Sequence, residues 1–176
     1  MTGFSPARLE NGDKITEEYV IAFYRANHTA DCLPYRVVEK RTYFFRAPSD
    51  FCQKAVRRIR KFLAEKDTTF SELMELPITA LSKLPDESWR EVPLHGLIQR
   101  QDIEYRDRWT ARMNTMRLAL TGGEPGPPVA TTMAILGKDR TMRRLAHIGS
   151  VIAGETGEVD PVNGTSTSAA AERISG

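Results

Sequence analysis

The sequence predicts a predominantly helical α+β fold, in which a small two-stranded ribbon packs on two main helices and is followed by a C-terminal helical arm and a disordered tail. Residues 35–46 are rich in Val, Thr, Tyr and Phe, a composition typical of strands. Residues 50–66 and 98–120 repeat apolar side chains at helical spacing. A Pro/Gly-rich stretch at 123–128 separates these elements from the rest of the chain.

These features divide the chain into five expected segments. They are a flexible leader at 1–14, a main α+β domain at 15–122, a Pro/Gly linker at 123–128, a helical arm at 129–153 and a disordered tail at 154–176. The linker contains two adjacent prolines, which cannot donate backbone hydrogen bonds. The tail is rich in Gly, Ser, Thr and Ala and offers too little apolar surface to offset its ordering entropy.

The first strand of the ribbon has a helical alternative. Within residues 15–26, Thr16 followed by two glutamates resembles a helix N-terminus, whereas the apolar run Tyr19–Tyr24 is aromatic and β-branched enough for a strand. We favour a strand. In the second strand, the three aromatic residues at 43–45 cannot all face one side of a pleated ribbon, so both faces need cover.

The helical segments are defined by capping residues and prolines. Ser49 is a suitable N-cap for the helix at 50–66, whose apolar face contains Ile59 and Phe62. Residues 67–97 are expected to form short helical turns, because prolines at 77, 85 and 93 interrupt them. The helix at 98–120 ends at Gly122 and its neighbouring glycine.

Composition indicates a globular protein without a secretory leader or membrane segment. The chain has 176 residues, 40% of them hydrophobic, and a net charge of +2. Its start lacks an apolar signal region, and no run approaches the ~18 apolar residues of a membrane helix. We therefore expect a cytoplasmic protein in a reducing compartment, or one carried within a virus particle, with Cys32 and Cys52 as free thiols.

No catalytic or metal-binding pattern is evident. His28, His95 and His147 lie in unrelated contexts, and neither cysteine has a partner at metal-ligand spacing. The glycine-rich stretch at 120–126 lacks the spacing of a phosphate-binding loop. The sequence therefore predicts that the protein is not an enzyme, with no catalytic residue, metal, cofactor or small-molecule substrate, and the residues alone identify no family.

A basic strand-helix face is the first candidate site. Residues 36–66 contain ten basic and three acidic side chains, and clustered cations can neutralise several phosphates at once. The candidate contacts are Arg36, Lys40 and Arg41 on the strand, with Lys54, Arg57, Arg58 and Lys61 on the helix. The alternative is a solvated helix face whose cations pair with acidic segments of this protein or a neighbour.

The second candidate is a helix-turn-helix-like unit at residues 130–148. A short helix, a glycine turn at Gly137 and a basic second helix carrying Arg140, Arg143 and Arg144 follow the order of that motif. No third helix adjoins the unit, and Lys138 stands where an apolar residue would help. A helical hairpin or a partner-docking arm would account for the same pattern.

Together these features predict a non-enzymatic structural or assembly subunit. It would self-associate or dock on a larger particle of the virion or nucleoprotein type, and its basic face would contact nucleic acid or an acidic partner. The expected partners are therefore the chain itself or a larger protein assembly, with nucleic acid as a further candidate and no membrane. The alternative is a DNA-binding transcriptional regulator that uses residues 130–148.

Overall fold

The computed structural model describes residues 8–27, 34–100 and 106–154. Within these ranges the secondary structure is helical, apart from one isolated bridge between Arg8 and Lys14. The expected two-stranded ribbon is wrong. The elements in chain order are α1 (Glu17–Asn27), α2 (Pro34–Lys40), the 3₁₀ turn η1 (Thr42–Phe44), α3 (Gln53–Glu65), α4 (Phe70–Lys83), the 3₁₀ turn η2 (Asp86–Ser88), α5 (Glu91–Arg100), α6 (Arg106–Thr121), α7 (Val129–Leu136) and α8 (Lys138–Ala153).

The segment expected as the first strand is helix α1. The Thr16 hydroxyl accepts a hydrogen bond from the Tyr19 backbone N–H at 3.2 Å. Glu17 and Glu18 lie in the first turn, where their negative charges interact favourably with the positive end of the helix dipole. Phe23 is completely buried. Local capping and one buried helical face therefore outweigh the β-propensity of the aromatic run.

The segment expected as the second strand forms α2 and η1 instead. The turn directs Tyr43 and Phe44 into the core and leaves Phe45 half-buried. The Phe23 ring lies 5.3 Å from that of Phe44 and 5.0 Å from that of Phe45, both edge-on. A 3₁₀ turn thus resolves the problem that three consecutive aromatics pose for a pleated strand.

Helix α3 starts later than its sequence suggests. Its N-cap is Cys52 rather than Ser49, and the Cys52 backbone N–H donates to the carbonyl of Gly122 at 2.8 Å. Val56 and Ile59 are buried, as the apolar spacing predicts. A contact with a distant loop, rather than a local side-chain cap, sets the first residue of α3.

Helix α4 runs through a proline that was expected to break it. Pro77 is buried inside the helix and cannot donate to the carbonyl of Leu73, four residues earlier. The Nε of the buried Arg112 donates to that carbonyl at 2.8 Å. The side chain from α6 therefore satisfies the acceptor that the proline leaves open, and 70–83 is one helix rather than two turns.

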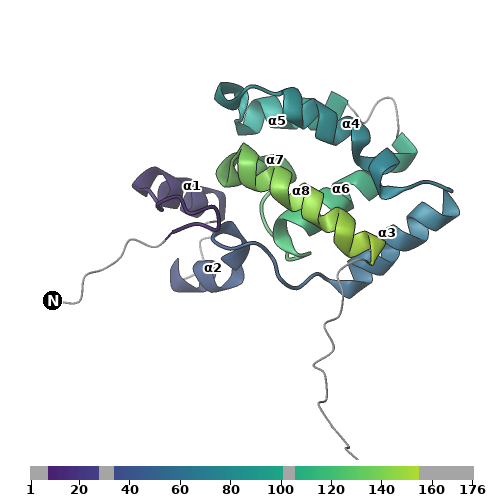
Figure 1. The fold of residues 1–176 in the computed structure, drawn as a ribbon. Helices are drawn as coiled ribbons and strands as arrows, with labels where there is room; N and C mark the ends of the chain where they lie inside the picture. Colours follow the sequence, from purple (N-terminus) through teal and green to yellow (C-terminus); the bar gives the residue numbers. More distant parts are fainter. Residues whose placement is uncertain (1–7, 28–33, 101–105, 155–176) are drawn as a thin grey trace, which may run out of the picture.

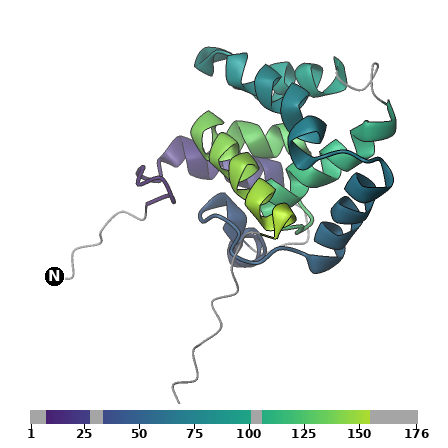
Figure 2. The ribbon, with the colours of Figure 1, turned by 45° about the vertical axis from the view of Figure 1, so that its right-hand side comes forward.

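The expected helix at 98–120 is represented by α5 and α6, with residues 101–105 outside the described ranges. Helices α7 and α8 lie at the centre of the bundle (Figure 1). In Figure 2, α4 and α5 lie above them, α3 to the lower right, α2 below and α1 to the left. Residues 129–153 are thus core elements: α8 packs on α6 and α4, and α7 on α5. Of the expected flexible leader at 1–14, residues 8–14 are described, and there Leu9 is buried and Glu10 pairs with Arg144. Residues 1–7, and the expected tail at 154–176 apart from Gly154, lie outside the described residues.

The helices are too short or too polar to span a lipid bilayer, as far as the described part of the chain goes.

Candidate nucleic-acid interface

Helix α3 presents a row of cations to solvent. Lys54, Arg57, Arg58 and Lys61 are all exposed, on the side opposite the buried Val56 and Ile59. Lys61 lies 3.6 Å from Glu65 in an exposed pair, which contributes little because both groups are hydrated. The four cations, hereafter the α3 basic face, are available to an external polyanion.

A fifth cation of α3, Arg60, has a structural role. Its guanidinium donates to the carbonyls of Val151 and Ile152 at 2.8 Å each. These carbonyls belong to the last turn of α8, where helical donors run out and the Val151 carbonyl accepts only a long bond from the Gly154 N–H, at 3.3 Å. Arg60 therefore fixes the end of α8 to the side of α3.

The described cations ahead of α3, and Arg143 on α8, lie at least partly in solvent. Lys40 is exposed, and Arg41 is half-buried and donates to the Lys40 carbonyl at 3.2 Å. The side chain of Arg36 lies outside the described set. On α8, Arg143 is exposed and pairs with Asp139 one turn earlier.

Arg140 and Arg144 lie inside the protein. Only 3% and 4% of their surfaces are exposed. Arg140 donates to the carbonyls of Leu136 at 2.6 Å and Phe44 at 2.9 Å. Their expected role as polyanion contacts is therefore corrected, because neither guanidinium can reach an external phosphate.

Arg144 joins three segments of the chain. It donates to the carbonyl of Tyr43 at 2.7 Å and that of Leu120 at 2.6 Å, and its ion pair with Glu10 measures 2.9 Å. Burial lowers the pKa of Arg144, and the hydrogen bonds and charge of Glu10 oppose this shift. The pair fixes the backbone of η1 in place.

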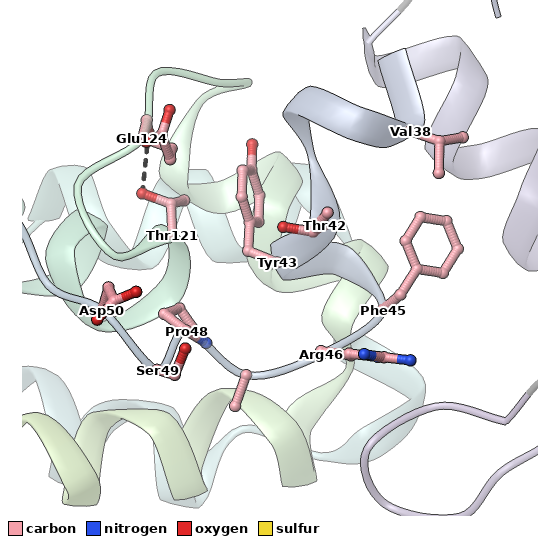
Figure 3. Close-up of a pocket in the computed structure, with 11 residues that line it drawn as sticks. Val38, Thr42, Tyr43, Phe45, Arg46, Pro48, Ser49, Asp50, Thr121 and Glu124 are labelled. Atoms are coloured by element: carbon pink, nitrogen blue, oxygen red, sulfur yellow. Dashed lines mark hydrogen bonds between the residues drawn. The ribbon is translucent and has the colours of Figure 1, made fainter. Parts of the chain in front are cut away.

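That backbone forms one wall of a pocket of about 540 Å³, hereafter the Tyr43 pocket. Figure 3 shows the loop at 121–124 and the turn at 42–44 on either side of the pocket, and the segment at 45–50 running below both. The lining side chains are aliphatic, aromatic, hydroxyl-bearing and charged: Val38, Thr42, Tyr43, Phe45, Arg46, Ala47, Pro48, Ser49, Asp50, Thr121 and Glu124.

Tyr43 packs against the glycine-rich loop. A Cβ at Gly126 would stand 2.1 Å from the Tyr43 hydroxyl, so this close approach requires glycine. The hydroxyl is buried and makes no hydrogen bond to any described residue. Burial raises the pKa of Tyr43 to about 12, against the opposing positive charges of Arg41 and Arg117.

The opposite wall is attached to the start of α3. The Thr121 hydroxyl lies 2.9 Å from the carbonyls of Arg117 and Glu124, which closes the loop (Figure 3). Gly122 has a φ of 69°, and a Cβ there would stand 2.7 Å from the carbonyl oxygen of Asp50. Since Gly122 also accepts from Cys52, the Tyr43 pocket adjoins the N-terminal end of α3.

The Tyr43 pocket and the α3 basic face favour different parts of a nucleotide. Asp50 and Glu124 give the pocket carboxylates, which repel phosphate but accept hydrogen bonds from the amino groups of bases. Arg46 adds a donor, and the half-buried Phe45 adds aromatic surface. The α3 basic face has no such carboxylates except Glu65, so it suits phosphates.

Residues 35–148, well over half of the chain, match the family model described as the anticodon binding domain. This range contains both the Tyr43 pocket and the α3 basic face. The chain belongs to the anticodon binding domain family.

Relatives of this family member are tRNA ligases. Glutamate–tRNA ligase 1 of Alkalilimnicola ehrlichii is 29% identical over 109 residues, which are 62% of this chain and 21% of the relative. Glutamate–tRNA ligase of Methylobacillus flagellatus is 25% identical over 142 residues, 81% of this chain and 28% of the relative. The chain thus spans about a quarter of the length of these relatives.

A solved structure shares the fold. The crystal structure of a glutamate tRNA ligase from Elizabethkingia meningosepticum, in complex with its amino acid, aligns with a TM-score of 0.61 and 20% identity. The alignment covers 81% of this chain and 27% of the other.

Family membership overturns three expectations. A structural or assembly subunit of the virion type is wrong, as is a transcriptional regulator using residues 130–148, because the matched family binds anticodons. The expectation that the protein is non-enzymatic is also overturned, because the relatives are glutamate–tRNA ligases. Self-association, assembly partners and a location in a virus particle receive no support from these relatives.

The Tyr43 pocket escaped the sequence interpretation. The loop at 121–126 is recognisable as a break between helices, but nothing in it indicates which distant residues it contacts. The burial of Arg140 and Arg144 did leave a signal. Arg140, Arg144 and Ile148 follow one another at intervals of four residues. Residues at this spacing share one face of a helix, so both arginines lie on the apolar face of α8 with Ile148.

Proposed function

We propose that this chain is the anticodon-binding part of a glutamate–tRNA ligase and holds the anticodon loop of a tRNA. The observation that supports it best is the Tyr43 pocket at the end of a cationic helix, within the residues that match the family. Since the chain spans a quarter of its relatives, the proposal for the chain itself is RNA binding. Attachment of glutamate is proposed for the whole ligase, in the cytoplasm.

In this proposal the pocket and the helix divide the recognition of the loop. Unpaired bases enter the Tyr43 pocket, where Asp50, Glu124 and Arg46 distinguish their hydrogen-bonding edges. The phosphates that follow lie along the α3 basic face. Arg140 and Arg144 hold the η1 carbonyls that shape the Tyr43 pocket.

The α3 basic face is tested by replacing Arg57 and Arg58 together with Gln. Affinity for an anticodon stem-loop should weaken, and the slope of log affinity against log salt should flatten by roughly 0.7–0.9 for each phosphate that is no longer neutralised. Melting temperature should be unchanged, because both side chains are exposed. The measurement is a titration of stem-loop RNA at several salt concentrations.

The matched control removes two exposed cations elsewhere. Lys83 ends α4 and Arg90 precedes α5, on the side of the bundle away from α3 (Figure 1). Lys83→Gln with Arg90→Gln removes the same net charge and should leave the salt slope as it was. Equal losses from the two double variants would mean that net charge alone attracts RNA, and the α3 basic face would be abandoned as a site.

A further inference from the structure

A second pocket adjoins the Tyr43 pocket. It measures about 250 Å³, and Ala47 and Pro48 line both pockets. Its other walls come from distant parts of the chain: Phe51 ahead of α3, Ala119 on α6 and His147 on α8. The rings of Phe51 and His147 lie 5.8 Å apart at 51°, so we name it the Phe51–His147 pocket.

The aromatic rings are accessible, whereas the polar groups of this pocket are engaged. His147 is exposed and Phe51 is half-buried. Both carboxylate oxygens of Glu10 accept hydrogen bonds from Arg144, at 3.1 and 2.9 Å. The pocket therefore offers stacking surface but few open hydrogen-bonding groups, unlike its neighbour with Asp50 and Glu124.

The surroundings of the pocket are cationic. Arg143 lies one helical turn before His147 on the same face of α8 and lines the pocket with more than half of its side chain exposed. The α3 basic face starts at Lys54, three residues after Phe51. An occupant with a flat ring and an attached negative charge fits both features.

We propose that the Phe51–His147 pocket stacks a second base of the bound RNA, next to the base held in the Tyr43 pocket. This rests on the proposed function. Since stacking uses the face common to all bases, the second site contributes affinity without selecting a base. The Ala47–Pro48 segment then lies between two successive stacking positions.

The test pairs protein variants with altered RNA. Stem-loop RNAs carry an abasic nucleotide at one loop position at a time, and each is titrated against the wild-type chain and against His147→Ala. For the intact stem-loop, His147→Ala should weaken binding about five-fold or more, whichever base occupies the stacked position. At that position the abasic RNA should bind His147→Ala no more weakly than the intact RNA does, because the variant has already removed the stacking partner of that base.

Two further variants separate stacking from folding. His147→Phe keeps an aromatic ring and should retain wild-type affinity, and Phe51→Leu keeps an apolar side chain but removes the ring and should weaken binding. Melting temperatures establish that each variant is folded. Weaker binding by His147→Phe, equal to that of His147→Ala, overturns the stacking role.

The outcomes also separate this inference from the proposed function. If the wild-type chain binds no stem-loop RNA, the proposed function fails. If it binds, and Arg57→Gln with Arg58→Gln weakens binding while His147→Ala and Phe51→Leu do not, only the second base site is overturned. The occupant of the Phe51–His147 pocket would then be a polypeptide segment rather than a base. A loss of RNA affinity in His147→Ala that depends on which base is present also overturns the second base site.

Discussion

Three arginines within five residues of α8 have different environments. Arg140 and Arg144 are 3% and 4% exposed, whereas 57% of the Arg143 side chain is exposed. All three side chains carry the same positive charge, so charge alone predicts that each of them contacts phosphate. Their positions around the helix separate them, because residues four apart share one face and that face is buried here.

Tyr43 provides a residue-scale prediction about pH. The phenol has an ordinary pKa of 10.0 and a pKa of about 12 in the folded chain. A raised pKa means that folding favours the neutral phenol. The contribution of this neutral form to the unfolding free energy is therefore complete below pH 10, and it is lost as the pH rises toward 12. At about pH 11 the loss of unfolding free energy should reach about 1.4 kcal/mol.

The Tyr43→Phe variant isolates that contribution. At neutral pH its unfolding free energy should stay within about 0.5 kcal/mol of the wild type, because the hydroxyl makes no hydrogen bond to a described residue. Above pH 10 it should lose less stability than the wild type. Urea denaturation across this range measures both, and parallel pH profiles would contradict the assignment.

At the scale of the element, the N-terminal end of helix α4 and its middle are stabilised by different kinds of contact. The start is local: the Thr69 hydroxyl accepts from the Glu72 backbone N–H at 3.2 Å, and the Glu72 carboxylate accepts from the Thr69 N–H at 2.8 Å. The interior is tertiary, because Arg112 of α6 satisfies the carbonyl that Pro77 leaves without its helical donor.

The capping box gives the element-scale prediction. Thr69→Ala should lower the unfolding free energy by about 1 kcal/mol, because the first turn loses a side-chain acceptor. Thr79→Ala is the matched control: Thr79 is exposed within the same helix, where alanine is the better helix former. Urea denaturation of both variants measures the difference, and an equal effect would show that Thr69 does not act as a cap.

The same box has a pH signature. The Thr69 backbone N–H, followed by the hydroxyls of Thr68 and Thr69, lowers the pKa of Glu72 below 4.5. A lowered carboxyl pKa means that the stabilisation is present above pH 4.5 and is lost as the pH falls through the folded value. Glu72→Gln removes the titrating carboxyl, so the difference in unfolding free energy between this variant and the wild type should narrow in acid, as urea denaturation at several pH values would measure.

At the scale of the whole molecule, Arg144 connects segments that the chain keeps far apart. It pairs with Glu10, whose side chain is 17% exposed, and donates to carbonyls of η1 and α6. Because these partners lie in the N-terminal segment, the wall of the Tyr43 pocket and the end of α6, one side chain links the helical bundle to the pocket.

Arg144→Met should therefore lower the unfolding free energy by roughly 3 kcal/mol or more, since it leaves Glu10 without its counter-charge in a largely buried site. The neighbouring Arg143→Met is the control. Its exposed pair with Asp139 should change stability by less than about 1 kcal/mol. Denaturation curves of the two variants test this, and similar losses would show that burial of the Arg144 pair adds nothing.

The amino-acid sequence by itself determines several local features of this protein. The apolar spacing of α3, the approximate positions of α7 and α8, the break at 122–128 and the cationic character of residues 36–66 can all be read from it. Each depends on neighbours within one or two helical turns, or on charge alone. The binding of RNA by the basic face stays a prediction.

Only the tertiary structure decided the rest. Whether residues 17–27 and 42–44 are strand or helix depends on Phe23 meeting Phe44 and Phe45, and propensity alone favours the wrong answer. Which arginines reach solvent depends on carbonyls at Tyr43 and Leu120. The Tyr43 pocket exists because the loop at 121–126 packs against residues some 75 positions earlier, and contacts of that separation leave no periodic signal in the sequence.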